Sequence, residues 1–87
     1  LLDAQAQFDE GRRRLAAGSL KSALEHFQYA FDIEPKGRFL AWLGWTTYQL
    51  EPNAAQRALE TLRRACELEP GCEEAHVWRG DLAMVLG

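Results

Sequence analysis

The sequence lacks the features that would indicate a membrane segment or a β-rich fold. No apolar run approaches the 18 or so residues that a membrane-spanning helix needs. No run of β-branched residues is longer than Thr46-Thr47, which disfavours strands. The three prolines, Pro35, Pro52 and Pro70, all fall where turns are expected. With 47% hydrophobic residues the chain can still form a core. We therefore expect an all-α protein whose helices are separated by short turns.

Cysteine is also scarce, with two residues in the chain. Cys66 occupies an apolar position of an expected helix, so we interpret it as a small core residue. Cys72 falls in a turn, and a Cys66–Cys72 disulfide, which would join a helix end to that turn, is the less favoured alternative. Free thiols are typical of a reducing compartment, so we predict a cytoplasmic protein.

Motifs for catalysis, cofactors and metals are missing. His26 and His76 stand alone, with no further ligand at metal-binding spacing. The sequence contains neither a Gly-rich phosphate loop nor a nucleophile elbow. It begins without an initiator Met, and its single Met is Met84, so we expect a piece of a longer protein. We predict that these residues have no enzyme activity and bind no cofactor or metal.

The net charge of −3 disfavours general binding to nucleic acid or acidic membranes. Two basic clusters, residues 12–14 and residues 63–64, have acidic residues at helical spacing nearby. We interpret both clusters as solvated helix faces rather than as a nucleic-acid interface. We therefore expect neither nucleic acid nor a membrane as a partner.

What the chain does contain is an internal duplication. Residues 23–35 read ALEHFQYAFDIEP and residues 58–70 read ALETLRRACELEP, identical at six of thirteen positions. Each copy ends at Glu-Pro, where proline stops a helix. A repeat of this length indicates stacked supersecondary units.

The apolar positions of the two copies match one for one and follow helical spacing. They are Leu20, Ala23, Leu24, Phe27, Ala30 and Phe31 in the first copy and Ala55, Ala58, Leu59, Leu62, Ala65 and Cys66 in the second. Small residues at Ala30 and Ala65 would let a neighbouring helix approach closely.

The turn signals divide the chain into five helices. Asp3 is suited to cap the first helix and Gly18 to end it, Ser19 to start the second, and Asn53 with Gln56 to cap the fourth. The expected ranges are about 1–17, 19–33, 38–50, 53–68 and 73–85.

This pattern resembles the tetratricopeptide repeat, a helix–turn–helix unit of about 34 residues with small residues and a proline at fixed places. The positions that match are Ala23, Phe27, Ala30 and Pro35, then Ala58, Leu62, Ala65 and Pro70, together with Gly11, Leu43-Gly44 and Gly80. The resemblance implies an α-solenoid of antiparallel helix pairs, with about two and a half repeats at 4–35, 37–70 and 73–87. A related repeat that reads RNA one base at a time fits the acidic charge and the small-residue pattern less well.

The resemblance also implies a function in protein–protein interaction. In that family the first helix of each repeat lines a concave groove that takes a peptide. Trp42, Trp45 and Tyr48 recur on a second apolar face of the third helix, which either lines this groove or packs in the core. Phe8 fits the groove and the core, and we favour the core. The residues that we predict to bind a partner are Arg12, Trp42, Trp45, Tyr48, Trp78 and Asp81.

Some members of the family hold a peptide's C-terminal carboxylate with Lys, Asn and Arg side chains in the groove. The corresponding positions here are Phe8, Arg12, Trp42, Glu74 and Trp78. Arg12 could serve in this way, but Glu74 would repel a carboxylate. We therefore expect that this mode of binding does not operate.

The alternative function is structural, with the module stacking on further repeats or forming a homodimer. Leu82, Val85 and Leu86 belong to an apolar surface on the fifth helix that no helix of this chain is expected to cover. Such surfaces often bind a partner. We predict these three residues as the self-association surface.

Overall fold

The computed structural model describes residues 3–87, and they form five α-helices joined by short turns. The helices are α1 (Ala4–Ala16), α2 (Leu20–Ile33), α3 (Gly37–Leu50), α4 (Ala55–Leu68) and α5 (Glu73–Leu86), with a 3₁₀ turn η1 (Pro52–Ala54) before α4. The described range contains no strand, and none of its helices is long and apolar enough to cross a membrane. The expected all-α class is confirmed.

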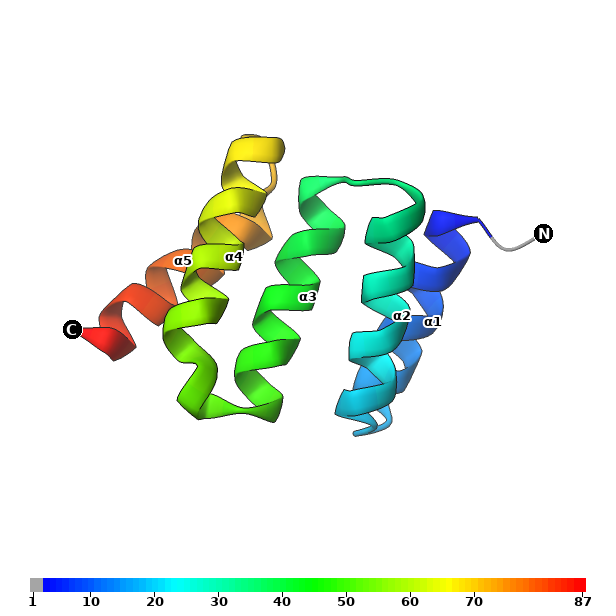
Figure 1. Ribbon diagram of the computed structural model, residues 1–87, viewed down its shortest axis with the longest axis horizontal. Coiled ribbons are helices and arrows are strands. Elements are labelled where there is room, and N and C mark those ends of the chain that lie inside the picture. Colours follow the sequence, from blue (N-terminus) through cyan, green and yellow to red (C-terminus); the bar gives the residue numbers. More distant parts are fainter. Residues whose placement is uncertain (1–2) are drawn as a thin grey trace.

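The helices form an elongated array of 43 × 27 × 17 Å in which chain neighbours pack antiparallel. Figure 1 shows α2, α3 and α4 side by side, with α1 behind α2 and α5 behind α4. The central helix α3 contacts α2, α4 and α5. This arrangement of successive helix pairs is an all-α repeat fold.

The first turn of α1 and its end follow the sequence signals. The Asp3 side chain accepts a hydrogen bond from the Ala6 backbone N–H at 2.7 Å, which satisfies one free donor of the first turn. Gly18 has φ +85°, a left-handed conformation that glycine adopts without strain. Leu1, with which the expected helix began, lies outside the described residues.

The start of α4 differs from the expectation. Asn53 was expected to cap the helix, but it lies inside η1, and α4 begins at Ala55. The Ala54 N–H donates to the Glu51 carbonyl at 2.8 Å, which closes a tight turn at Pro52 before α4 begins. Proline suits the first position of such a turn because its φ is already fixed there.

The start of α3 also lies one residue earlier than expected, at Gly37. Glu69, at the end of α4, accepts a hydrogen bond from the Arg38 backbone N–H at 3.0 Å. A Cβ on residue 37 would lie 2.5 Å from the Ala65 carbonyl oxygen, a distance that side chains do not tolerate. Glycine therefore lets the end of α4 approach closely enough to cap α3.

Two adjoining core clusters hold the array together. One joins α1, α2 and the start of α3, and the other joins α3, α4 and α5. The expected small positions Ala30 and Ala65 are both completely buried, and Cys66 is buried as predicted. The first cluster comprises Ala4, Phe8, Ala23, Phe27, Ala30 and Phe39, and the second includes Leu40, Ala58, Leu62, Ala65, Cys66, Ala75 and Leu82.

Two of the glycines that carry the repeat resemblance mark close approaches between helices. A Cβ on Gly11 would lie 2.6 Å from the Phe27 ring, and one on Gly44 would lie 3.0 Å from the Thr61 methyl group. The corresponding Gly80 on α5 has no such neighbour among the described residues. The first two helix pairs therefore pack through a glycine, whereas this side of α5 is open.

Enlarging a buried alanine tests this packing. We expect Ala65→Leu to lower the free energy of unfolding by about 1–3 kcal/mol, because the added methylene groups have no space at a fully buried site. Ala17→Leu, at an exposed position, serves as the matched control and should change it by less than about 0.5 kcal/mol. Chemical denaturation measures both, and equal losses in the two variants would contradict the packing.

Candidate functional site

Five aromatic side chains form a continuous row across α1, α3 and α5. The Trp42 ring lies edge-on to Phe8 at 5.5 Å and edge-on to Trp78 at 5.1 Å between ring centroids. Trp45 stacks on Trp78 at 5.4 Å with the ring planes 5° apart, and Tyr48 follows at 5.5 Å from Trp45. We call these five side chains the aromatic row. All three tryptophans of the chain belong to it.

The aromatic row combines a buried end with partly exposed rings. Phe8 is completely buried among Phe27, Phe39 and Trp42, so the favoured assignment of Phe8 to the core is confirmed. Trp42, Trp45, Tyr48 and Trp78 remain partly exposed. Each of these four rings packs against a core cluster with one part and is open to solvent with another. The core reading therefore describes the packed part of Trp42 and Trp45, and a role of their open parts in lining a groove stays a prediction.

Arg12 places a positive charge beside the row. Its guanidinium lies 5.2 Å from the Trp42 ring centroid and 5.9 Å from that of Phe8, a cation–π arrangement. The side chain is exposed, and within residues 3–87 it forms no ion pair. Arg12 is therefore available to an acidic group outside the chain.

The other two arginines of the 12–14 cluster are already paired. Glu10 binds Arg13 at 2.8 Å and Arg14 at 2.7 Å. Hydrogen bonds from Arg14 and then Arg13 lower the pKa of Glu10 to about 2. The reading of this cluster as a solvated, charge-paired helix face holds for Arg13 and Arg14.

Glu74 holds the Trp42 ring of the row through a hydrogen bond. Its carboxylate accepts a hydrogen bond from the Trp42 indole N–H at 3.3 Å and forms an ion pair with Arg38 at 3.3 Å. Burial alone would raise the pKa of Glu74, but hydrogen bonds from its own backbone N–H and from Trp42, with the Arg38 charge, bring that pKa below its usual value. The carboxylate is therefore charged at neutral pH and orients the Trp42 ring.

Cys72 lies beside Glu74, and its buried thiol donates a hydrogen bond to that carboxylate at 3.6 Å. Burial raises the pKa of the Cys72 thiol, and the nearby carboxylates raise it further. A protonated thiol is a poor nucleophile and a poor metal ligand. Residues 3–87 also contain no cluster of three His, Cys, Asp or Glu side chains that could hold a metal.

The structure brings together most of the residues predicted to bind a partner. Trp42, Trp45, Tyr48 and Trp78 form one surface, with Arg12 at its α1 side. Asp81 is exposed on α5, one turn beyond Trp78. The sequence reasoning missed Arg38, whose guanidinium lies 5.1 Å from the Phe8 ring centroid. Its position one helical turn before Trp42 could have placed it on this face.

The surface predicted for self-association needs a correction. Leu82 is completely buried in the core cluster of α3, α4 and α5, because it lies on the inner side of α5. It is therefore unavailable at the surface. Val85 and Leu86 are exposed, and Val77 and Met84 lie exposed on the same helix.

Comparison with known proteins gives one similarity over nearly the whole chain. Over 85 residues, 98% of this chain, the sequence is 32% identical to DnaJ homolog subfamily C member 3 from Rattus norvegicus. The aligned region spans 17% of the length of that protein. No protein-family model matches the chain.

The pH dependence of stability tests the Glu74 contacts. Because the pKa of Glu74 is lower in the folded protein than its ordinary value of 4.5, its stabilising effect is present above that pH and is lost as the pH falls through the folded pKa. We expect Glu74→Gln to destabilise the protein at pH 7, with the difference from wild type shrinking as the pH falls below 4.5 and through the lower pKa of the folded protein. Denaturant unfolding at several pH values measures this difference in the free energy of unfolding.

Glu73→Gln is the matched control, because Glu73 is an exposed neighbour in the same first turn of α5. Its difference from wild type should remain small at every pH. A Glu74→Gln difference that does not change with pH would show that the carboxylate charge is not what stabilises this site.

Proposed function

We propose that the chain is a tetratricopeptide-repeat-like module that binds a segment of a partner protein along the aromatic row. Three observations support this family and function. The fold is an array of antiparallel helix pairs, and the small-residue positions of the repeat are buried in it. The similarity to a DnaJ homologue covers 98% of the chain.

The aromatic row itself is the observation that carries the proposal. Aromatic side chains often dominate binding energy because they remove a large apolar area from water at a small cost in side-chain entropy. Here four partly exposed rings pack against one another, and Glu74 accepts a hydrogen bond from one of them, Trp42, so we expect that little ordering is needed on binding. A partner segment would place apolar or aromatic side chains against Trp45 and Trp78.

The charges beside the row determine which segment fits best. Arg12 offers a guanidinium that has no acidic partner within residues 3–87, so it favours an Asp or Glu on the bound segment. Glu74 is paired with Arg38, which reduces its repulsion of such a group. Asp81 would favour a basic side chain at the α5 side. We do not propose that the row binds the C-terminal carboxylate of a peptide.

We propose binding rather than catalysis as the activity, and the raised pKa of Cys72 is consistent with this because it disfavours a nucleophilic thiolate beside the row. The two cysteines, Cys66 and Cys72, are free, which fits the reducing conditions of the cytoplasm. We propose that the chain acts in the cytoplasm.

Tryptophan fluorescence gives a direct test, because every tryptophan of the chain lies in the aromatic row. Peptides selected from a random displayed library should shift the emission of the wild-type protein on binding. We expect Trp45→Ala to weaken such a peptide by about 2 kcal/mol, roughly thirtyfold, because it removes a central ring of the row. Isothermal titration calorimetry measures the affinity, and circular dichroism checks that the variant folds.

Ile33→Ala is the control, because Ile33 is an exposed apolar residue on α2, away from the row. It should leave the affinity unchanged. Selected peptides that bind Trp45→Ala as tightly as wild type, without shifting its emission, would place binding elsewhere.

A second function, self-association through α5, rests on a separate observation. Val77, Met84 and Val85 follow helical spacing on one side of α5 and are each more than half exposed. Gly80 lies among them with no heavy atom near the position of a Cβ. A glycine within an apolar stripe lets another helix approach closely, so this face is suited to packing against a second copy.

Measurement of molecular mass tests self-association. We expect sedimentation equilibrium at micromolar concentration to show a dimer, and Met84→Glu with Val85→Glu to give a monomer of unchanged helicity. Ile33→Glu, which adds charge at an exposed apolar residue on α2, should leave the dimer intact. A monomeric wild-type protein at these concentrations would contradict this second function. Leu82→Glu is unsuitable as a test because Leu82 is in the core.

A further inference from the structure

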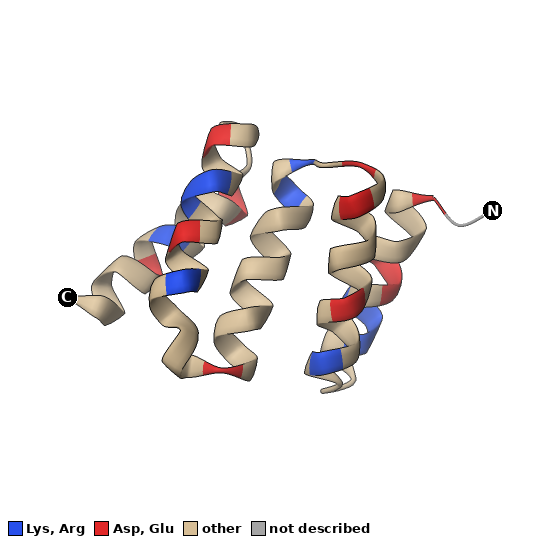
Figure 2. Ribbon diagram, in the orientation of Figure 1, with Lys and Arg blue, Asp and Glu red and all other residues tan. Residues whose placement is uncertain are grey.

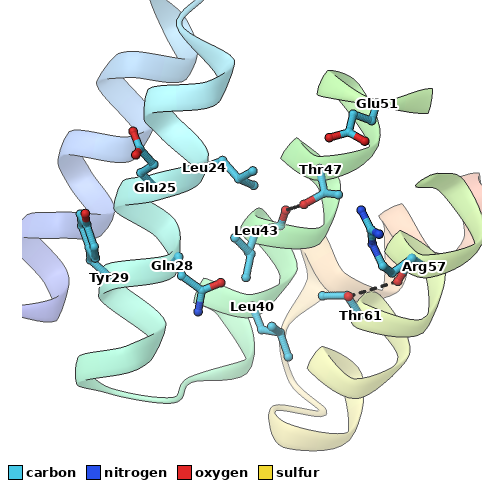
Figure 3. A pocket seen from close by; sticks show the side chains of 10 residues that line it. All are labelled: Leu24, Glu25, Gln28, Tyr29, Leu40, Leu43, Thr47, Glu51, Arg57 and Thr61. Atoms are coloured by element: carbon cyan, nitrogen blue, oxygen red, sulfur yellow. Dashed lines mark hydrogen bonds between the residues drawn. The ribbon is translucent and has the colours of Figure 1, made fainter. Parts of the chain in front are cut away.

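A second recess lies on the other side of α3, between α2 and α4. Figure 3 shows Leu24 of α2 and Leu43 of α3 pointing into it, with Arg57 and Thr61 of α4 along the opposite wall. Its volume is about 450 Å³. The full lining is Leu24, Glu25, Gln28, Tyr29, Leu40, Leu43, Thr47, Glu51, Arg57 and Thr61, which we call the α2–α4 groove.

The groove shares no residue with the aromatic row. Leu40, Leu43 and Thr47 follow one face of α3, whereas Trp42 and Trp45 follow the opposite face. Leu40 is buried, while Leu43 and Thr47 are partly exposed. The face thus packs and also forms the floor of a groove.

The floor of the groove is largely apolar. The Thr47 hydroxyl donates to the Leu43 carbonyl at 2.8 Å, and the Thr61 hydroxyl donates to the Arg57 carbonyl at 3.1 Å. Both hydroxyls are therefore satisfied within their own helices and do not require a polar ligand. Tyr29, on the α2 wall, is 52% exposed and adds an aromatic surface. The floor and this wall favour aliphatic side chains.

The charged side chains that line the groove have no ion-pair partners within the described part of the chain. Glu25, Glu51 and Arg57 are exposed, and none of them forms an ion pair within the described part of the chain. Figure 2 shows α3 without any charged residue between Arg38 and Glu51. The groove therefore has an apolar floor bordered by two carboxylates, one on α2 and one at the end of α3, and by the Arg57 guanidinium on α4. Its net charge is negative.

We propose that the α2–α4 groove binds an amphipathic helix of a partner protein that carries a basic side chain. The two carboxylates supply the charge complementarity, because a Lys or Arg on the bound helix would be attracted to Glu25 on α2 or to Glu51 at the end of α3. Leu40 and Thr47 are seven residues apart, so the apolar floor extends about 10 Å along α3. That length matches the i, i+3 and i+7 positions of a helix that binds in a groove.

The shape of the groove favours a helix over a small ligand. Small-molecule sites bury most of their ligand in a concave pocket. Here α2 and α4 form two walls with α3 as the floor, and the side away from α3 is open (Figure 3). A helix laid on this floor would contact three helices at once, which is the environment of a helix in a bundle.

A designed peptide is the probe for this proposal. It is a synthetic helix with leucines at i, i+3 and i+7 and a lysine one turn beyond the leucines at each end. We expect saturable binding, with the largest NMR shifts at backbone amides of the groove-lining residues. Glu25→Lys combined with Glu51→Lys should weaken the peptide by about tenfold or more, because like charges then face each other. The same peptide with glutamates in place of the lysines should recover affinity for this variant.

Glu60→Lys combined with Glu67→Lys is the matched control, since it makes the same charge change on the exposed face of α4, outside the groove. It should leave the affinity within about twofold of wild type. Trp45→Ala should also leave it unchanged, which separates this site from the aromatic row. Circular dichroism is expected to show both double glutamate variants folded, because each replaced glutamate is exposed, and it checks separately that Trp45→Ala folds.

Several outcomes would overturn the proposal. They are absence of saturation at millimolar peptide, NMR shifts confined to the aromatic row, and equal loss of affinity in the control variant. A fourth is a wild-type dimer without peptide that Glu25→Lys with Glu51→Lys dissociates, which would make a second copy of the chain the occupant.

Discussion

The buried ring of Phe8 is the contact on which the arrangement of the first three helices depends. It comes from α1 and lies 4.9 Å from Phe39 and 5.5 Å from Trp42, both on α3, and 5.6 Å from Phe27 on α2. The Phe27 ring can reach it because Gly11 leaves room for that ring on α1. A smaller residue at position 8 would leave a cavity between three helices. The aromatic row begins at this ring, so the surface is built directly on the core.

The central helix α3 has two opposite apolar faces, and both must be largely covered by other helices. Trp42 and Trp45 extend toward α1 and α5, while Leu40 and Leu43 face the groove between α2 and α4. A helix that is apolar on both faces is stable in water only when other helices cover most of it. Here α2, α4 and α5 do so, and the parts that remain partly exposed are the two candidate binding surfaces. Both surfaces therefore follow from the same constraint on α3.

The sequence was sufficient for the helix class and the buried positions of the repeats. Periodicity identified Phe27, Leu62 and the two small residues Ala30 and Ala65, because burial on one face of a helix leaves a regular pattern. It failed where contacts between distant residues decide the outcome. Glu69 caps α3 across 31 residues, and Glu74 pairs with Arg38 and Trp42 from a different helix. No local pattern encodes such contacts.

Leu82 and the α2–α4 groove show a second limit of the same kind. The spacing of apolar residues shows which face of a helix is apolar. It does not show what fraction of that face is covered by neighbouring helices. Leu82 is fully covered, whereas Leu43, on a face with similar spacing, is partly open. The degree of cover depends on the angles and separations of the packed helices, which are properties of the whole array.

The two candidate surfaces differ in charge, and this difference has a consequence for specificity. Arg12 offers a cation beside the aromatic row, whereas Glu25 and Glu51 give the groove an excess of negative charge. A segment with an acidic residue near Arg12 would be attracted to the row and repelled from the groove, whereas a basic helix would be attracted to the groove. Since the surfaces lie on opposite faces of α3 and share no residue, both could be occupied at once. A module of 87 residues could thus join two partners of opposite charge without competition between them.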